Sequence, residues 1–188
     1  MSDADVDVSG VVTEMLPEGH EWLRICDPSW SDPLDPNFAR ERGQRWNPPH
    51  SFPVLYVNED LVTARLNLRH FIAGWPFEPE DLRGEAAPCL VAAQLPRGQR
   101  VADLHTPAGV AAVGLPKSYP LDSAGRLVSH EVCQPIGTAV HALGLHGIRC
   151  RSARAPEGAA RELAWFPAGP RSRARFVSST AFEDWYYS

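Results

Sequence analysis

The alternation of apolar and polar residues predicts two strands in the first third of the chain, separated by an irregular segment. Residues 21–26, EWLRIC, alternate and contain Trp, Leu and Ile, so they predict a strand with Arg24 on one face. Residues 52–57, FPVLYV, predict a second strand. Five prolines fall within residues 27–49, which therefore predict a long loop, with a helical turn near residues 37–42.

Helical spacing appears in three later segments. An apolar stripe with steps of three and four predicts a helix over residues 58–73, with Asn58 as its N-cap. Residues 129–145 predict a second long helix, with Pro135 in its first turn or at a kink. Residues 106–114 predict a short helix, which Thr-Pro opens and Gly closes.

The remaining strand signals complete the prediction of one α+β domain. Further short strands are predicted at 89–95, 99–104, 147–150 and 163–166. We therefore expect a small mixed β-sheet with about three helices. Residues 1–18 are acidic and predict a loose lead-in, and residues 19–188 predict a single domain.

Composition narrows the class of protein. Of the 188 residues, 44% are apolar and 22% charged, which is typical of a soluble globular domain. No run of 18 apolar residues is present, so the sequence predicts no membrane-spanning helix. The net charge of −5 argues against a general nucleic-acid or membrane-surface binder. An Arg-rich patch at residues 149–175 is a local exception that could attract a phosphate-bearing ligand.

The cysteine and histidine spacings predict no metal site. Four cysteines are present without a CxxC pair, and neither HExxH nor a Gly-rich phosphate motif occurs. The N-terminus has no secretory signal pattern, so we expect a cytoplasmic protein with reduced thiols. Cys133 and Cys150 are predicted to lie in the core.

A few polar residues could carry chemistry, and each has a structural alternative. Arg24 in an apolar strand needs an anionic partner, which could be a ligand or an acidic side chain. Arg45 could grip a phosphate while Trp46 stacks on an aromatic ring. Tyr56 is more typical of a core tyrosine whose hydroxyl reaches the edge. Ser152 could simply form a turn.

Taken in order, these residues resemble the RES-domain family. The resemblance lies in LR at 23–24, GQRWNPPHSFPVLYV from Gly43, CQPIG at 133–137 and GIRCRSARAPEGAARELAWFP from Gly147. It covers about residues 20–170, and its most specific stretch is the one from Gly43. The resemblance implies a fold like that of the ADP-ribosyltransferase toxins, in which a small mixed sheet clasps NAD+.

The resemblance also implies a function and site residues. Many members are toxins of toxin–antitoxin pairs that degrade NAD+ by hydrolysis or by phosphorolysis, with inorganic phosphate as co-substrate and no metal. Their partner carries an Xre-like helix-turn-helix, whereas the toxin itself binds no nucleic acid or membrane. Self-association is expected as well. Carried over, the family arginine and serine fall on Arg24 and Ser152, and the second arginine and the tyrosine fall on Arg45 and Tyr56. Trp46 joins Arg24, Arg45 and Tyr56 as an expected NAD+ contact.

This sequence differs from the family pattern at the glutamate. Its pattern, A-x-x-E, matches Ala64-Arg65-Leu66-Asn67, so that Asn67 stands where the carboxylate belongs. Cleavage of the nicotinamide–ribose bond develops positive charge on the ribose, and a carboxylate stabilises that charge. Loss of the charge should cost about 10²–10³-fold in rate. Glu131 and Glu59 are candidates to replace it.

Two hypotheses therefore remain open. The first is an active NAD+-consuming toxin in which Asn67 lines the site as a weaker substitute. The second is a module that binds a nucleotide or a partner without cleaving anything, and a minor alternative is ADP-ribosylation of a protein. Asn67→Glu should create cleavage in a binding module and only accelerate it in an enzyme.

Overall fold

A computed structural model gives the fold. It describes residues 6–188, apart from residues 75, 77, 83, 85–86, 156–159 and 170. The chain forms one eight-stranded mixed sheet in the order β1-β5-β6-β7-β3-β2-β4-β8. Strands β5 and β6 pair in parallel, and the other neighbours pair antiparallel. The strands are β1 Thr13–Met15, β2 Glu21–Cys26, β3 Leu55–Asn58, β4 Cys89–Gln94, β5 Arg100–Leu104, β6 Gly147–Arg151, β7 Arg161–Trp165 and β8 Arg175–Thr180.

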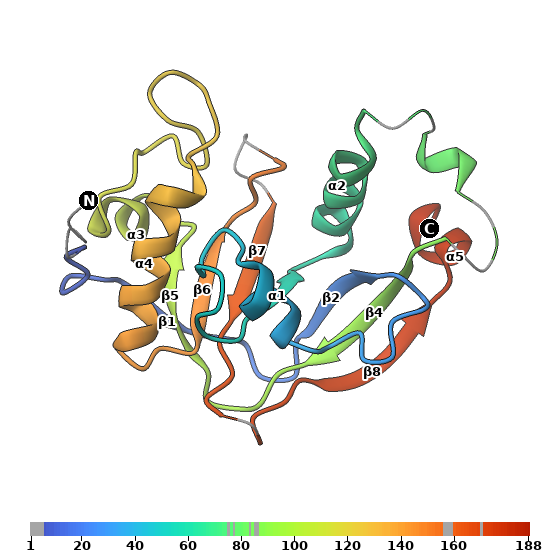
Figure 1. Cartoon of the computed structure of the whole chain (residues 1–188), viewed down its shortest axis with the longest axis horizontal. Helices are drawn as coiled ribbons and strands as arrows, with labels where there is room; N and C mark the ends of the chain where they lie inside the picture. Colours follow the sequence, from blue (N-terminus) through green and yellow to red (C-terminus); the bar gives the residue numbers. More distant parts are fainter. Residues whose placement is uncertain are drawn as a thin grey trace.

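Helices pack on the two halves of this strongly twisted sheet (Figure 1). They are α1 Asn37–Arg42, α2 Leu61–Ile72, α3 Pro107–Ala112, α4 His130–Ala142 and α5 Phe182–Tyr186, with a 3-10 turn η1 at Pro79–Asp81. Figure 1 shows α3 and α4 beside β5 and β6, and α2 and α5 toward the β2–β4–β8 half. Helix α1 lies between the two groups, so that α4 and α2 stand on either side of β7.

The core divides into three clusters that follow this arrangement. The largest lies under α4 and includes Trp46, Phe52 and Phe166. A second joins α2 to α5 around Leu68 and Phe182. The third contains Trp22, Leu55, Val57, Leu163 and Trp165. Cys133 and Cys150 are buried in the first cluster, and all four cysteines are free, as the sequence predicted.

The predicted mixed α+β sheet is confirmed, with differences at the ends of elements. Helix α2 begins after Asp60, whose side chain accepts a hydrogen bond from the Thr63 amide. Asn58, the predicted cap, instead ends β3. The described residues form five α-helices rather than about three, because the short helices α1 and α5, of 6 and 5 residues, add to the total.

The chain ends also hold structure that the sequence pattern did not reveal. Strand β1 lies within the segment predicted as a loose lead-in and pairs with β5. Strand β8 and helix α5 were not predicted, because β8 is a largely exposed edge strand with little apolar alternation. No helix in the described part of the chain has the length and apolar character needed to cross a membrane.

Candidate active site

A cluster of hydrogen bonds at one end of β7 joins side chains from β3, α2, the segment after β6, and β7 itself. Ser152, which follows β6, donates from Oγ to Oε1 of Glu162 at 2.5 Å. Asn67 on α2 donates from Nδ2 to the same oxygen at 3.0 Å. The same Asn67 nitrogen donates to Oδ1 of Asn58 at 2.5 Å. Two residues predicted for the site, Ser152 and Asn67, therefore meet on one carboxylate.

Strand register explains why these side chains converge. Asn58 and Glu162 are paired neighbours on the antiparallel strands β3 and β7. Cross-strand partners project from the same face of a sheet, so their side chains lie side by side. Helix α2 starts just after β3 and returns over that face, which brings Asn67 within reach. Ser152 is fully buried, whereas Glu162 is half-buried.

Sequence reasoning missed Glu162. The only signal was an acidic residue next to an otherwise apolar run, ELAW, which reads as the ordinary exposed start of a strand. The two acids considered as substitutes do not occupy this position. Arg149 neutralises Glu59 through hydrogen bonds of 2.8 and 2.5 Å, and Glu131 is exposed in the first turn of α4. In the described part of the chain, the side chains of Asn67 and Ser152 donate to Asn58 and Glu162, and neither donates to Glu59 or Glu131.

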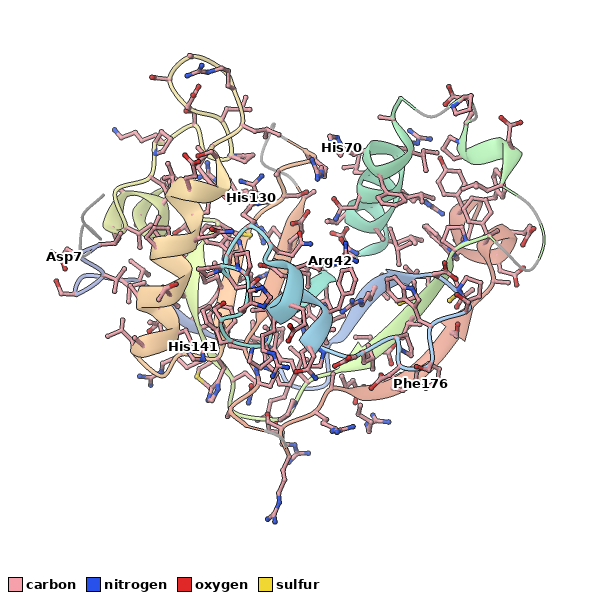
Figure 2. The ribbon with its side chains drawn as sticks, in the orientation of Figure 1. Asp7, Arg42, His70, His130, His141 and Phe176 are labelled. Atoms are coloured by element: carbon pink, nitrogen blue, oxygen red, sulfur yellow. The ribbon has the colours of Figure 1, made fainter. Side chains whose placement is uncertain are left out.

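Positive charge lies close to the cluster without pairing to it. The backbone amide of Arg154 donates to Oγ of Ser152, and its guanidinium contacts Nε2 of His70 at 2.5 Å. Burial lowers the pKa of Arg154, and the charge of Glu162 partly opposes that effect. Burial and the Arg154 charge lower the pKa of His70, which favours a neutral ring that accepts from Arg154. Figure 2 shows His70 on α2 and His130 at the start of α4, on either side of β7.

The side chain of His130 feels the positive charges of both Arg45 and Arg154. Burial lowers the pKa of His130, and the charges of Arg45 and Arg154 lower it further. Arg45 donates from Nη1 to the Val128 carbonyl at 2.8 Å. Nothing described in the structure accepts a hydrogen bond from its Nε or Nη2. Its guanidinium is therefore held at one nitrogen and can bind an anion with the others.

Tyr56 anchors the loop that carries Arg45. Its hydroxyl accepts from the Trp46 amide and donates to Oδ1 of Asn47, both at 2.9 Å. Asn47 in turn donates to the Ala39 carbonyl at 2.7 Å. Burial raises the pKa of Tyr56 far above its ordinary value, so the hydroxyl stays protonated. Tyr56 thus positions the loop, and its hydroxyl is already occupied.

The prediction that Trp46 stacks on a ligand ring is wrong for this structure. Trp46 is only 1% exposed and packs against Tyr119 in the core, with ring centroids 6.0 Å apart. A buried indole presents no face to a ligand. The backbone at Trp46 instead packs closely against α4, because a Cβ added at Gly137 would overlap the Trp46 carbonyl oxygen.

Arg24 lies apart from the cluster. Leu23 is the register partner of Asn58, so alternation along β2 places Arg24 on the opposite face of the sheet. Its guanidinium lies 5.6 Å from the ring of Trp30, and burial lowers its pKa. No carboxylate among the described residues lies within 4.0 Å, and the buried Nη1 has no hydrogen-bond partner there. The alternative of a salt bridge to an acidic side chain is therefore not seen.

One group of side chains has metal-ligand spacing. Ligand atoms of Glu14, Asp103 and His105 lie within 4.8 Å of one another. Each is already engaged, however: His105 bonds Glu14 at 2.9 Å, Thr106 donates to Asp103, and Arg149 donates to Glu14 at 2.8 Å. The group forms a hydrogen-bonded network between β1 and β5, and it touches none of the predicted site residues.

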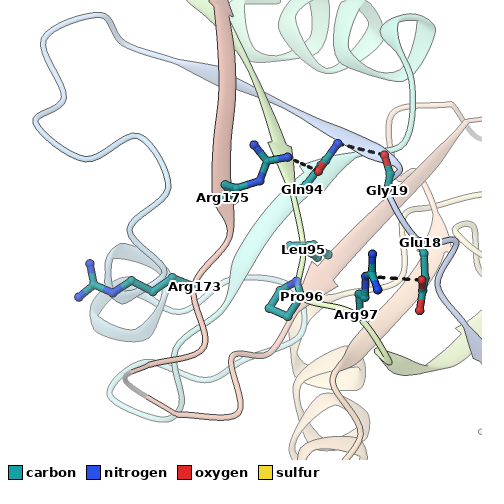
Figure 3. A pocket seen from close by; sticks show the side chains of 8 residues that line it. All are labelled: Glu18, Gly19, Gln94, Leu95, Pro96, Arg97, Arg173 and Arg175. Atoms are coloured by element: carbon teal, nitrogen blue, oxygen red, sulfur yellow. Dashed lines mark hydrogen bonds and ion pairs between the residues drawn. The ribbon is translucent and has the colours of Figure 1, made fainter.

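The Arg-rich patch is divided among several environments. Two of its members, Arg173 and Arg175, line an open pocket of about 540 Å³ together with Glu18, Gly19, Gln94, Leu95, Pro96 and Arg97 (Figure 3). In that pocket Arg97 pairs with Glu18 at 3.7 Å, and Arg175 bonds Gln94. The pocket shares no residue with the Ser152–Asn67–Glu162 cluster, so the patch does not form one anion-binding surface.

Comparison with known proteins defines the class of this fold and then the family. A chain from a solved structure entitled "Crystal structure of the M.tuberculosis MbcT-MbcA toxin-antitoxin complex" shares the fold, with a TM-score of 0.72 and 21% sequence identity. The match covers 96% of this chain and 95% of that chain. The RES domain model matches residues 21–185, so the chain belongs to the RES domain family. No curated protein matches it.

Proposed function

We propose that this chain is a RES toxin that consumes NAD+ by cleaving the nicotinamide–ribose bond. One observation carries the proposal: in a chain of this family, Ser152 and Asn67 converge on a half-buried carboxylate. Burial lowers the pKa of Arg154, and the charge of that carboxylate opposes this lowering, whereas the charge of Arg45 adds to it. Arginines next to an unpaired carboxylate suit a substrate that carries phosphates at one end and develops positive charge at the other.

Each predicted residue receives a role that fits its surroundings. Arg45 binds a phosphate of NAD+ through the nitrogens that the protein leaves free. Ser152 and Asn67 line the ribose end. Tyr56 acts through the loop it anchors rather than by contact with the nicotinamide riboside. Because Arg24 lies on the opposite face of the sheet, we assign it to an anionic group outside the Ser152–Asn67–Glu162 cluster, and its buried Nη1, which has no hydrogen-bond partner among the described residues, supports that assignment.

Departure of nicotinamide needs no protonation by a strong acid in the site. The C1′–N bond breaks, its electron pair neutralises the pyridinium nitrogen, and nicotinamide departs uncharged. The ribose becomes oxocarbenium-like until an oxygen of water or phosphate bonds to C1′. Water yields ADP-ribose and releases a proton, whereas phosphate yields ADP-ribose phosphorylated at the same ribose carbon. Fixed charges in the site lower the barrier because they need no reorganisation during the reaction.

We further propose a protein partner that neutralises the toxin. The solved structure with the same fold is a toxin–antitoxin complex, and the family resemblance points to an antitoxin with an Xre-like helix-turn-helix. The four free thiols fit a reducing cytoplasm, where NAD+ is available. The resemblance also favours self-association.

Proton NMR of purified protein with NAD+ tests the proposed reaction, with and without inorganic phosphate. We expect loss of NAD+ and a matching rise in free nicotinamide. A sugar-phosphate product that forms only with phosphate would indicate phosphorolysis, and ADP-ribose in both buffers would indicate hydrolysis. Intact NAD+ at high concentrations of folded protein would contradict the proposal.

A second candidate function is a binding module that does not cleave NAD+, and Asn67 in place of the family glutamate favours it. Calorimetry with NAD+ distinguishes the two, because a module would show stoichiometric binding and no nicotinamide. Transfer of ADP-ribose to a protein would appear as label on the acceptor and not in a free sugar product.

A further inference from the structure

The carboxylate of Glu162 is the unassigned group nearest to the predicted site residues. We propose that Glu162 supplies the negative charge that faces the ribose, and that Asn67 holds this carboxylate in place. The inference rests on the function proposed above. The family pattern places the carboxylate on helix α2, whereas the inference places it on strand β7. Asn67 is then a positioning residue rather than a weakened catalyst.

The hydrogen bonds orient the carboxylate asymmetrically. Ser152 and Asn67 both donate to Oε1, at 2.5 and 3.0 Å. No described residue donates to Oε2 of Glu162. One oxygen is thus fixed by the protein while the other is left for a substrate or an attacking nucleophile. A carboxylate held by neutral donors keeps its full charge.

The electrostatic environment of Glu162 also differs from that of Glu14 and Glu59. Within the described part of the chain, no Lys, Arg or His nitrogen lies within 4.0 Å of Glu162, whereas Glu14 and Glu59 both pair with Arg149. An ion pair cancels most of the field that a carboxylate exerts on a ligand. A half-buried carboxylate without such a pair acts strongly on a developing cation, because the surrounding dielectric is low.

The step balances with this residue in place. As the C1′–N bond breaks, its electrons leave with nicotinamide, and Glu162 stabilises the positive ribose. Water then bonds to C1′ through oxygen, and its proton passes to Oε2 and on to solvent. When monohydrogen phosphate attacks, its oxygen bonds to C1′ without loss of a proton.

The experiment compares four full-length proteins by their rate of nicotinamide release: wild type, Glu162→Gln, Asn67→Glu and the double variant with both changes. The amide introduced by Glu162→Gln keeps an oxygen that accepts from Ser152 and Asn67, so this variant loses the charge and retains the hydrogen bonds. We expect Glu162→Gln to lower kcat by about 10²–10³-fold. Asn67→Glu alone should not accelerate the reaction, because two carboxylates about 3 Å apart cannot both stay ionised.

The double variant is the most informative protein. It again carries one carboxylate, now at position 67, and we expect it to exceed Glu162→Gln by at least about tenfold as charge stabilisation returns. Glu131→Gln serves as the matched control, since this exposed residue contacts none of the cluster, and its rate should equal that of wild type. Circular dichroism of each variant verifies the fold.

The outcomes separate this inference from the function on which it rests. An inactive wild type overturns the proposed function and the inference with it. An active wild type with an equally active Glu162→Gln overturns the inference alone. An acceleration of about tenfold by Asn67→Glu does the same even if Glu162→Gln fails to fold, because it would show that the missing charge belonged at position 67.

Discussion

The hydroxyl of Tyr56 connects the sheet to the loop that carries Arg45. It is both donor and acceptor, and the two groups it satisfies belong to consecutive residues, Trp46 and Asn47. Because Trp46 is buried, its amide has no access to solvent as an alternative partner. The Tyr56 hydroxyl is therefore one of the anchors that fix the conformation of the Arg45 loop.

Tyr56→Phe tests this dependence. Loss of the hydroxyl leaves two polar groups unpaired, so we expect the free energy of unfolding to fall by about 1–3 kcal/mol. Equilibrium unfolding in urea measures it. Tyr187→Phe is the control, since Tyr187 is half exposed and contributes ring contacts, and it should change stability by less than about 0.5 kcal/mol. Equal stability of wild type and Tyr56→Phe would contradict the assigned anchoring role.

At the level of single residues, the sequence allowed part of the hydrogen-bonded cluster to be predicted, and the catalytic roles of its members stay a prediction. Ser152 and Asn67 were singled out by motif, and they do share a cluster. Glu162 could not be found, because its importance comes from the pairing of β3 with β7, which joins segments distant in sequence. Trp46 was misassigned because a motif specifies residue type but not exposure.

Helix α4 and the Arg45 loop are packed so closely that one position allows no side chain. A Cβ on Gly137 would overlap the Trp46 carbonyl oxygen, well inside any permitted contact. This explains the glycine that ends CQPIG in physical terms: the helix backbone rests on the loop backbone. The contact also fixes Arg45 relative to α4, and Val128, which precedes the N-cap of that helix, accepts a hydrogen bond from Arg45.

We expect Gly137→Ala to destabilise the protein by about 1–3 kcal/mol through overpacking, although alanine is the better helix former by about 1 kcal/mol. Thermal unfolding measures the change. Thr138→Ala, one residue further on the exposed side of α4, is the matched control and should stay within about 0.5 kcal/mol of wild type. A Gly137→Ala variant more stable than wild type would show that the helix and loop can separate without cost.

Most elements could be predicted from pattern, and the exceptions share a physical cause. Helices α2 and α4 have apolar stripes, and β2, β4 and β5 have apolar runs bounded by turn residues. The edge strands β1 and β8 have few buried residues and depend on hydrogen bonds to one neighbour. Strands that depend on such hydrogen bonds show little regular spacing of apolar residues, so the sequence pattern does not predict them.

At the scale of the whole molecule, a network of charges ties the N-terminal strand to the centre of the sheet. Arg149 on β6 donates to Glu14 on β1 at 2.8 Å and to Glu59 after β3 at 2.8 and 2.5 Å. The Arg149 side chain is only 13% exposed. Three segments far apart in sequence therefore share one partly buried guanidinium.

Glu14→Gln should lower the free energy of unfolding by about 1.5–3 kcal/mol, because Arg149 loses a charged hydrogen-bond partner in a partly buried place. Urea unfolding gives the value. Glu18→Gln is the control, since the Glu18–Arg97 pair is 3.7 Å long and exposed on both sides, and we expect a change below about 1 kcal/mol. Equal effects of the two substitutions would contradict a central role for the network.

The overall charge of −5 fits a protein whose positive groups serve as local sites rather than as a surface. Its arginines divide between structural pairs such as Arg149 and proposed site residues such as Arg45. The molecule as a whole should therefore not attract nucleic acid, and its anion binding should be confined to NAD+ and phosphate.

The most direct test of this account is the time course of nicotinamide release from NAD+ by the full-length wild-type chain, recorded beside Glu162→Gln under the same conditions. The account predicts steady release by wild type and a rate about 10²–10³-fold lower in the variant. Folded wild-type protein that releases no nicotinamide would contradict the account at its centre.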